Sequence, residues 1–301
     1  MNHTIKMLSS IVFGLIMSSC TKTVEFDIPN QKEKPVILAY AESGKHVQVL
    51  VTKTYPITQY VLPNTIEMIQ TNVRLTLNDN QSEELTYSNG VYQSLLIPED
   101  GDVLKLRTTV YGDSIFASST MPIKCPIKKL NYKADGFIDS EGDKLNQISF
   151  EFDDDSSKTN YYEIYVKRTI SNENGIETIK PYYYASNDPV LLNEGLLDYE
   201  IRSLLFSDIL FNGKSVVLSV AFSNIYLYNE EKLIKSEFFL ASVSETYYNY
   251  QKTLYKHMNN QSSGSFWQSL SEPVPIYTGI TNAYGVFAAY SISSQEFNEN
   301  E

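Results

Sequence analysis

The sequence predicts an all-β fold of two β-sandwiches with one helix late in the chain. Short runs of alternating apolar and polar residues recur from residue 35 onward, and turn residues separate them. The chain has 23 Tyr and 14 Phe but one Trp, and both abundant types favour half-buried strand positions. Its length of 301 residues favours two domains over one.

The first sandwich is expected at residues 35–126, with an immunoglobulin-like or transthyretin-like arrangement. Asn89–Gly90 is the strongest hairpin signal in the chain, and Tyr111–Gly112–Asp113 marks another turn. Ser43–Gly44 separates the first two strands. The predicted strands are Pro35–Tyr40, Val47–Thr52, Asn72–Leu77, Leu85–Tyr87, Val91–Leu95, Val103–Val110 and Ser114–Thr120.

The second sandwich is expected at residues 127–295, resembling a fibronectin-like domain with insertions. The terminal segment Glu296–Glu301 is expected to fray in solvent. The predicted strands are Lys129–Tyr132, Gln147–Phe152, Tyr161–Arg168, Ile179–Ala185, Val216–Phe222, Glu237–Ala241, Val274–Thr278 and Val286–Ile292.

One segment, residues 242–259, has helical spacing. Ser242 and Glu245 match a capping box, in which the two side chains satisfy free amide donors at a helix start. Apolar residues then recur at intervals of three and four and predict one buried helix face. These residues are Tyr247, Tyr250, Leu254 and Met258.

Residues 1–19 have the pattern of a signal peptide. The apolar run Met7–Met17 is too short to span a bilayer, which takes about 20 residues. It leads into Met17–Ser18–Ser19–Cys20, which resembles the lipobox of bacterial lipoproteins. This resemblance implies cleavage before Cys20 and lipidation of its thiol. The alternative is an ordinary secretory signal with a cysteine there by chance.

Residues 20–34 are polar and are expected to form a tether. Acyl chains contribute about 0.8 kcal/mol per buried methylene, so two or three chains give stable anchoring. The absence of Asp directly after Cys20 favours the outer membrane under the usual sorting pattern. Glu25 and Asp27 leave display at the cell surface open.

The formal net charge of −12 argues against nucleic acid as a partner and against electrostatic docking on anionic lipid. With Cys20 lipidated, Cys125 is the only other cysteine, so no intrachain disulfide can form. The packed cores therefore have to hold the fold.

Several local patterns resemble the Bacteroidetes lipoproteins grouped as domain of unknown function 4249. These are the Cys-Thr-Lys start with Val24–Pro29, the block Phe206–Lys214, the segment Ser244–Tyr250, and the C-terminal segment Pro275–Phe287. The resemblance covers nearly all of the chain after the signal peptide. It implies an outer-membrane lipoprotein, often encoded beside a TonB-dependent transporter, and it supplies no catalytic residues.

The sequence lacks the common motifs of catalysis and cofactor binding. The chain after residue 19 has two histidines, His46 and His257, and no zinc-type His or Cys pair. No nucleophile elbow, P-loop or dinucleotide fingerprint occurs. We therefore expect no enzyme and no cofactor, although a triad of residues distant in sequence would leave no motif. Cys125 is expected to be a small buried apolar residue.

Two acidic groups have the oxygen ligands that calcium prefers, with solvated turns as the alternative. They are Asp139, Glu141 and Asp143, and the run Asp153, Asp154 and Asp155. Aromatic groups that could stack on a sugar or peptide, or simply pack in strands, are Tyr182, Tyr183 and Tyr184, Tyr226 and Tyr228, Tyr247, Tyr248 and Tyr250, and Trp267. Asp208 and Asn212–Gly213 are expected to form a structured turn.

The sequence therefore favours a lipid-anchored outer-membrane binding lipoprotein, working with a β-barrel transporter in nutrient capture. A structural or assembly lipoprotein without a small ligand is the main alternative. A hydrolase in the second sandwich is a further alternative, and it requires a histidine beside a nucleophile.

Overall fold

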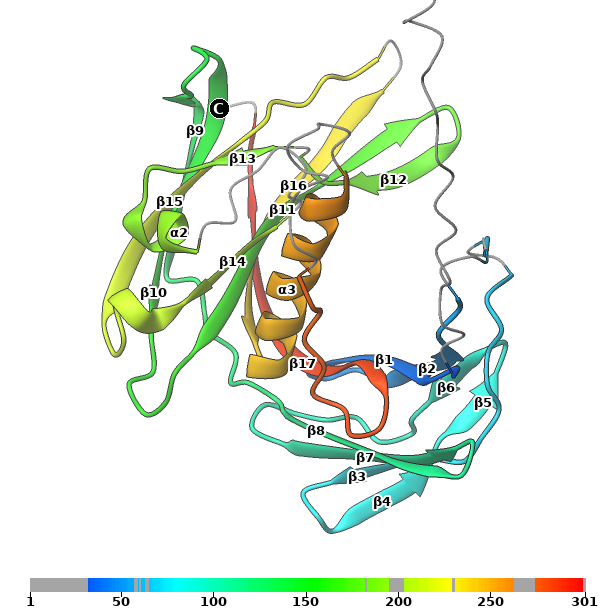
Figure 1. Ribbon diagram of the computed structural model, residues 1–301. Helices are drawn as coiled ribbons and strands as arrows, with labels where there is room; N and C mark the ends of the chain where they lie inside the picture. Colours follow the sequence, from blue (N-terminus) through cyan, green and yellow to red (C-terminus); the bar gives the residue numbers. More distant parts are fainter. Residues whose placement is uncertain are drawn as a thin grey trace, which may run out of the picture. The chain divides into compact units, whose positions relative to one another are not determined.

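Three β-sheets, a long helix and a short helix make up the part of the chain that the computed structural model describes (Figure 1). That part comprises residues 32–56, 59, 61–62, 65–181, 183–194, 203–228, 231–262 and 274–299. The chain divides into one unit at residues 1–32 and another at residues 33–301, which is the unit described below. The predicted signal peptide and Cys20 lie outside the described residues, as do Tyr182 and Trp267.

The largest sheet, here called the long sheet, runs in the order β12-β11-β16-β17-β1-β2-β6-β5, with β14 also paired to β11. β1 and β17 pair in parallel, although they come from opposite ends of the described chain. The strands are β1 (Pro35–Glu42), β2 (Gln48–Lys53), β5 (Thr86–Ser88), β6 (Val91–Gln93), β11 (Tyr161–Asn172), β12 (Gly175–Ile179), β14 (Leu204–Ser207), β16 (Lys232–Val243) and β17 (Tyr284–Phe297).

Two four-stranded sheets pack on one face of the long sheet, and the long helix α3 (Glu245–Ser262) packs on the other. The N-terminal sheet has the order β4-β3-β7-β8, and the C-terminal sheet has the order β13-β15-β10-β9. Their strands are β3 (Val73–Leu77), β4 (Gln81–Glu84), β7 (Val103–Val110), β8 (Asp113–Thr120), β9 (Lys129–Ile138), β10 (Lys144–Asp153), β13 (Tyr184–Ala185) and β15 (Ser215–Phe222). The short helix α2 spans Pro189–Asn193, and the 3-10 turn η2 spans Asp208–Leu210.

Two of the turns predicted in the first half have the backbone conformation of a tight hairpin and join the expected strands. Asn89 and Gly90 have φ of 51° and 85°, and Tyr111 and Gly112 have φ of 53° and 87°. Positive φ at both central residues defines the two-residue turn whose twist matches that of a hairpin. These turns set the β5–β6 and β7–β8 pairings, as the sequence predicted.

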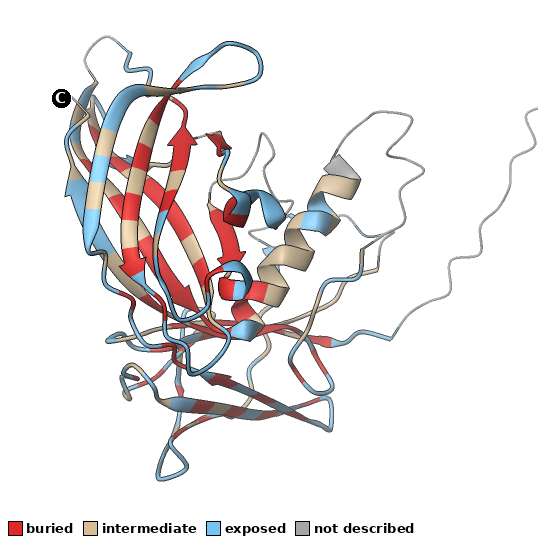
Figure 2. Ribbon diagram, turned by 90° about the vertical axis from the view of Figure 1, so that its left-hand side faces the viewer, coloured by how far each residue is buried: buried red, intermediate tan, exposed pale blue. Residues whose placement is uncertain are grey.

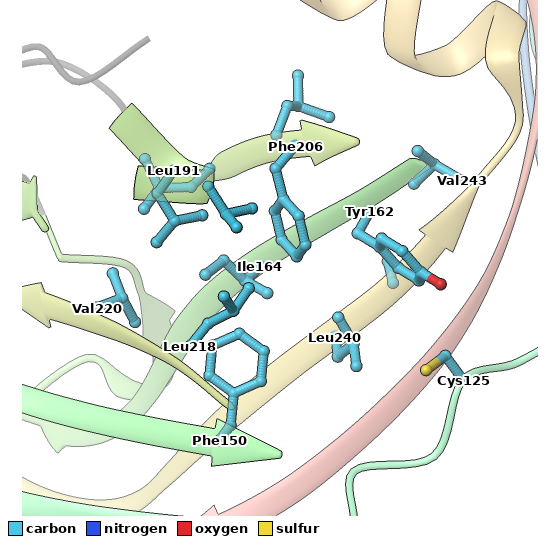
Figure 3. Close-up of a cluster of buried hydrophobic side chains, with 14 of the residues drawn as sticks. Cys125, Phe150, Tyr162, Ile164, Leu191, Phe206, Leu218, Val220, Leu240 and Val243 are labelled. Carbon is cyan, nitrogen blue, oxygen red and sulfur yellow. The ribbon is translucent and has the colours of Figure 1, made fainter. Parts of the chain in front are cut away.

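The apolar side chains form two cores. The N-terminal core lies between β1, β2 and β6 of the long sheet and the N-terminal sheet. The C-terminal core lies between β11 and β16 and the C-terminal sheet, and Figure 3 shows Phe150, Ile164 and Leu240 within it. Figure 2 shows the alternation of buried and exposed residues that places these side chains inside. The mainly β, sandwich-like fold predicted from the sequence is therefore confirmed.

Strand β17 joins the two clusters of buried residues. Phe287 and Ala289 point into the N-terminal core, whereas Val286 and Ala288 point to the opposite face, which carries α3, and belong to the same buried cluster as the C-terminal core. The long sheet therefore contains strands from both sides of the predicted domain boundary at residue 126. Residues 33–301 form a single unit because β17 joins the two halves.

Two predicted strands differ in the structure. The segment Ile179–Ala185 is divided, since β12 ends at Ile179 and β13 joins another sheet, with Pro181 between them. The segment Val274–Thr278 forms no strand, and the next pairing in the described chain is an isolated bridge between Thr281 and Phe116. Proline has no amide hydrogen to donate to a ladder, which accounts for the interruptions at Pro181 and Pro275.

The helix begins later than predicted. Ser242 belongs to β16, and Ser244 is the residue whose hydroxyl accepts a hydrogen bond from the Tyr247 amide, at 3.2 Å. The strand continues to Val243 because its residues pair with Tyr161 and Tyr290 on both sides. The predicted cap at Ser242 is therefore wrong by two residues.

The buried part of α3 is its first turn. Tyr247 and Tyr248 are buried, whereas Met258, predicted on the same face, is 58% exposed. Figure 2 shows burial concentrated at the end of the helix that adjoins the sheet. The helical spacing thus predicted the helix, but it did not predict that only the first turn of the helix is buried.

Candidate ligand-binding groove

An open groove of about 710 Å³ lies on the face of the long sheet that carries α3. We call it the aromatic groove. Strands β1, β11, β16 and β17 supply its floor, because alternate residues of each strand point to this face. Its lining includes five aromatic residues, namely Tyr40, Tyr165, Phe239, Tyr247 and Tyr290.

A flat pair of rings forms one side of the aromatic groove. Tyr165 and Phe239 are register partners on β11 and β16, with ring centroids 4.8 Å apart and an interplanar angle of 11°. Cross-strand aromatic pairs stabilise a sheet and present a continuous apolar surface. Phe239 is half-buried, so part of its ring is open to the groove.

The other side holds three tyrosines in edge-to-face contact. The Tyr247 ring centroid lies 5.8 Å from that of Tyr40 and 5.8 Å from that of Tyr290. The hydroxyl of Tyr247 donates to Glu163 at 2.6 Å, and that of Tyr290 donates to Glu42 at 3.2 Å. The helix α3 is therefore joined to the sheet floor by ring contacts and by a partly buried hydrogen bond.

Burial and neighbouring carboxylates control the charge state of these phenols. Burial raises the pKa of Tyr40 and of Tyr290. The charge of Glu163 raises both pKa values further, and the charge of Glu42 also raises that of Tyr290. Burial raises the pKa of Tyr165 as well. The phenols therefore stay protonated at neutral pH and act as hydrogen-bond donors or acceptors.

Lysines flank the aromatic floor. Lys167 Nζ lies 4.8 Å from the Phe239 centroid and 5.3 Å from the Tyr165 centroid, while Lys180 Nζ lies 4.2 Å from the Tyr165 centroid. Cations within about 6 Å of a ring face are attracted by its quadrupole. The aromatic groove thus combines an apolar floor with Glu42 and Glu163 as acceptors and with ammonium donors at its rim.

The sequence prediction found only part of this groove. Tyr247, from the predicted Tyr247–Tyr250 group, contributes to it. Glu163, Tyr165 and Lys167 were missed, although they alternate along β11 on one face. This alternation of bulky polar residues could have indicated a surface-facing side of β11, but it does not identify the strands and the helix that complete the groove.

Tyr183 and Tyr184, the described members of the predicted Tyr182–Tyr184 group, are not exposed. Tyr184 is 1% exposed, and its hydroxyl accepts a hydrogen bond from the Val166 amide at 2.9 Å. Tyr183 is half-buried against the small cluster around Ala221. Tyr184 is therefore a core residue, because β13 pairs with β15 beside the buried Phe222.

The two groups of predicted calcium candidates lie at opposite ends of β10, one in the turn before the strand and the other at its end. Asp139 accepts hydrogen bonds from the Glu141 and Asp143 amides, which makes it a local turn residue. Asp153 pairs with Lys128 at 2.8 Å, and Asp155 accepts from Ser157. Among the residues that the structure describes, no group of three His, Cys, Asp or Glu could hold a metal ion.

The block Phe206–Lys214 is a tightly bonded turn, as predicted. Asp208 is buried and accepts from the Asn160 amide at 2.8 Å. Asp154 accepts from the Gly213 amide at 2.7 Å and from the Tyr162 hydroxyl at 2.5 Å. These two carboxylates fix the turn to the start of β11.

The cysteine and the two histidines weighed in the sequence analysis lie outside the lining of the aromatic groove. Cys125 is buried, its thiol donates to the Asp153 carbonyl, and burial raises its pKa to about 12. It packs at the edge of the C-terminal core (Figure 3), as predicted for a small apolar residue. His46 is exposed, and His257 Nδ1 lies 2.8 Å from the Val274 carbonyl oxygen.

The fold and the groove define an all-β, sandwich-like protein with an open aromatic groove on its central sheet. A family model described as Domain of unknown function (DUF4249) matches residues 21–296, so the chain belongs to this family. The predicted family resemblance is thereby confirmed. Comparison with curated proteins finds no match. No helix in the described part of the chain has the length and apolar character needed to cross a membrane.

Proposed function

We propose that this protein is a lipid-anchored binding lipoprotein of the outer membrane that holds a carbohydrate in the aromatic groove. The proposal rests chiefly on the Tyr165–Phe239 pair, which offers a flat apolar platform beside carboxylate acceptors. A pyranose ring has an apolar C–H face that packs on such rings and hydroxyls that donate to carboxylates. Glu42 and Glu163 line the groove where those hydroxyls would lie.

A binding role accords better with this chemistry than a hydrolytic one. The described lining contains no histidine or cysteine. Cys125 is held as a neutral thiol by burial, so it is a poor nucleophile. Glycoside hydrolysis uses a pair of carboxyl groups, but Glu42 and Glu163 each already accept a hydrogen bond from a tyrosine hydroxyl, and we propose no catalytic step at this site.

Titration with neutral oligosaccharides tests the groove directly. Tyrosine fluorescence or chemical-shift changes would be followed with maltohexaose, cellohexaose and xylohexaose, for the native chain and for Phe239→Leu. Saturable binding by one sugar, weakened at least tenfold in F239L, is the expected result. Tyr284→Leu is the matched control, because Tyr284 is a 45% exposed aromatic residue that does not line the aromatic groove. Absence of saturation by all three sugars at millimolar concentration would refute a neutral-sugar site.

We further propose that the lipoprotein delivers its ligand to a TonB-dependent β-barrel transporter. Tyr226, Leu227 and Tyr228 are 73%, 41% and 77% exposed in the connection between β15 and β16, and such apolar side chains suit a partner surface. A pull-down from outer membranes in mild detergent should recover a β-barrel protein, and Tyr226→Ser with Tyr228→Ser should lose it. Recovery of the lipoprotein alone would favour a structural envelope role.

The anchor is tested separately. Mass spectrometry of the native protein should find an acylated N-terminal cysteine at position 20, and Cys20→Ser should be released from membranes. An unmodified N-terminus would contradict the lipoprotein assignment and leave the sugar-binding test unaffected.

A further inference from the structure

A second groove, of about 850 Å³, lies on the outer face of the N-terminal sheet. We call it the arginine groove. Its lining shares no residue with the aromatic groove, and it includes Arg74, Glu84, Arg107, Thr109, Ser114 and Phe116. The chain has a formal net charge of −12 and only a few arginines, so two of them in one groove is a local feature.

The two arginines are direct neighbours. Arg74 on β3 is the register partner of Arg107 on β7, and both are exposed. Directly opposite residues of antiparallel strands have Cβ atoms about 5 Å apart, and like charges at such positions destabilise the pair. Guanidinium groups stay charged at any physiological pH, so loss of a proton cannot relieve this repulsion.

The next cation on the same face, Lys105, is neutralised by a carboxylate, whereas the two arginines are not neutralised in this way in the described part of the chain. Lys105 Nζ lies 2.6 Å from the Asp79 carboxylate. Glu84 is the register partner of Arg74, yet within the described residues no ion pair joins it to either arginine. The Arg107 guanidinium instead lies 5.4 Å from the Phe116 ring centroid.

We propose that Arg74 and Arg107 together bind an oxyanion, a carboxylate, sulfate or phosphate group carried by a ligand. Adjacent guanidinium forks offer parallel N–H donors that match the oxygens of such groups. A bound anion would also remove the repulsion between the two cations. The hydroxyls of Thr109 and Ser114 and the ring of Phe116 flank the arginines and suit a polar ligand with an apolar face, such as a uronic acid.

Calorimetric titration at constant ionic strength tests the proposal with three anionic probes and one neutral probe. The probes are sodium glucuronate, sodium sulfate and sodium phosphate, with glucose as the neutral counterpart of glucuronate. Saturable binding of at least one anion is expected, with a loss of tenfold or more in both Arg74→Gln and Arg107→Gln. Preference for glucuronate identifies a carboxylate ligand, and preference for sulfate or phosphate identifies a tetrahedral one.

Lys129→Gln is the matched control, because it removes one exposed positive charge from β9 of the C-terminal sheet. It should bind the anion within about twofold of the native chain, since a remote exposed charge is largely screened by salt. Circular dichroism verifies that every variant is folded. Equal binding by the native chain and both arginine variants would overturn the proposal, and so would the absence of saturation by all three anions.

Discussion

Arg168 and Glu299 form a buried, two-pronged ion pair between residues 131 positions apart in the chain. The Arg168 Nε and Nη2 atoms donate to the two Glu299 oxygens at 2.6 and 2.7 Å, and Ser236 donates to the same carboxylate. The side chains are 2% and 5% exposed. The expectation that Glu296–Glu301 frays in solvent is therefore wrong for Glu299, because this pair fixes it beside β11.

Glu299→Gln should lower the free energy of unfolding by about 3–5 kcal/mol, because it leaves the Arg168 charge buried without its counter-ion. Urea denaturation followed by circular dichroism measures this. Glu296→Gln is the control, since Glu296 is 68% exposed in its pair with Lys235 and such pairs contribute about 1 kcal/mol or less. Equal losses in both variants would contradict a special role for Glu299.

The pH dependence of stability should carry a contribution from Glu194. Burial alone would raise its pKa, but hydrogen bonds from Lys252, Tyr248 and Ser207 outweigh that effect and lower the pKa below its ordinary value. A lowered pKa in the folded state gives stability that is present above the unfolded pKa, near 4.5, and is lost as pH falls through the folded pKa.

Glu194→Gln should therefore lose about 2 kcal/mol or more at pH 7 and show a flatter decline of stability below pH 4.5. Unfolding midpoints measured across this pH range give the slope. Asp79→Asn should leave the slope unchanged, because Asp79 is 70% exposed. A slope in Glu194→Gln identical to that of the native chain would contradict the assignment.

Gly285 permits the pairing that joins the two halves of the chain. Its φ is +104°, and a Cβ atom there would lie 1.9 Å from the Ile37 carbonyl oxygen, across the β1–β17 register. Gly285→Ala should therefore cost more than about 3 kcal/mol, since both the backbone and the strand spacing have to change. Gly44→Ala, at φ +77° with open space around it, should cost about 1 kcal/mol. Thermal unfolding of both variants distinguishes the two costs.

The start of α3 gives a test between two serines. Ser244→Ala should cost about 1 kcal/mol or more, because the hydroxyl accepts from the Tyr247 amide and also from the Ala289 amide. Ser242→Ala should be neutral or stabilising, because the buried Ser242 hydroxyl has no hydrogen-bond partner within the described residues. A larger loss in Ser242→Ala than in Ser244→Ala would restore the cap predicted from the sequence.

Local features of the chain were readable from the sequence. Asn89–Gly90 and Tyr111–Gly112 fixed two hairpins because positive φ at both positions admits few other structures. Alternation along Val103–Val110 and Tyr161–Arg168 located strands β7 and β11, and the signals of the long helix were correct to within a few residues. The sequence patterns also led to the family that the chain belongs to.

Only the tertiary structure decided which strands pair and what lies between them. Alternation of apolar and polar residues indicates that one face of a strand is buried, but it does not identify the strand that pairs with it. The sequence therefore did not predict the parallel β1–β17 pairing or the way β17 joins the two clusters of buried residues. The aromatic groove, the Arg74–Arg107 pair and the Arg168–Glu299 ion pair all join residues far apart in the chain. Their chemistry exists only once the sheets bring those side chains together.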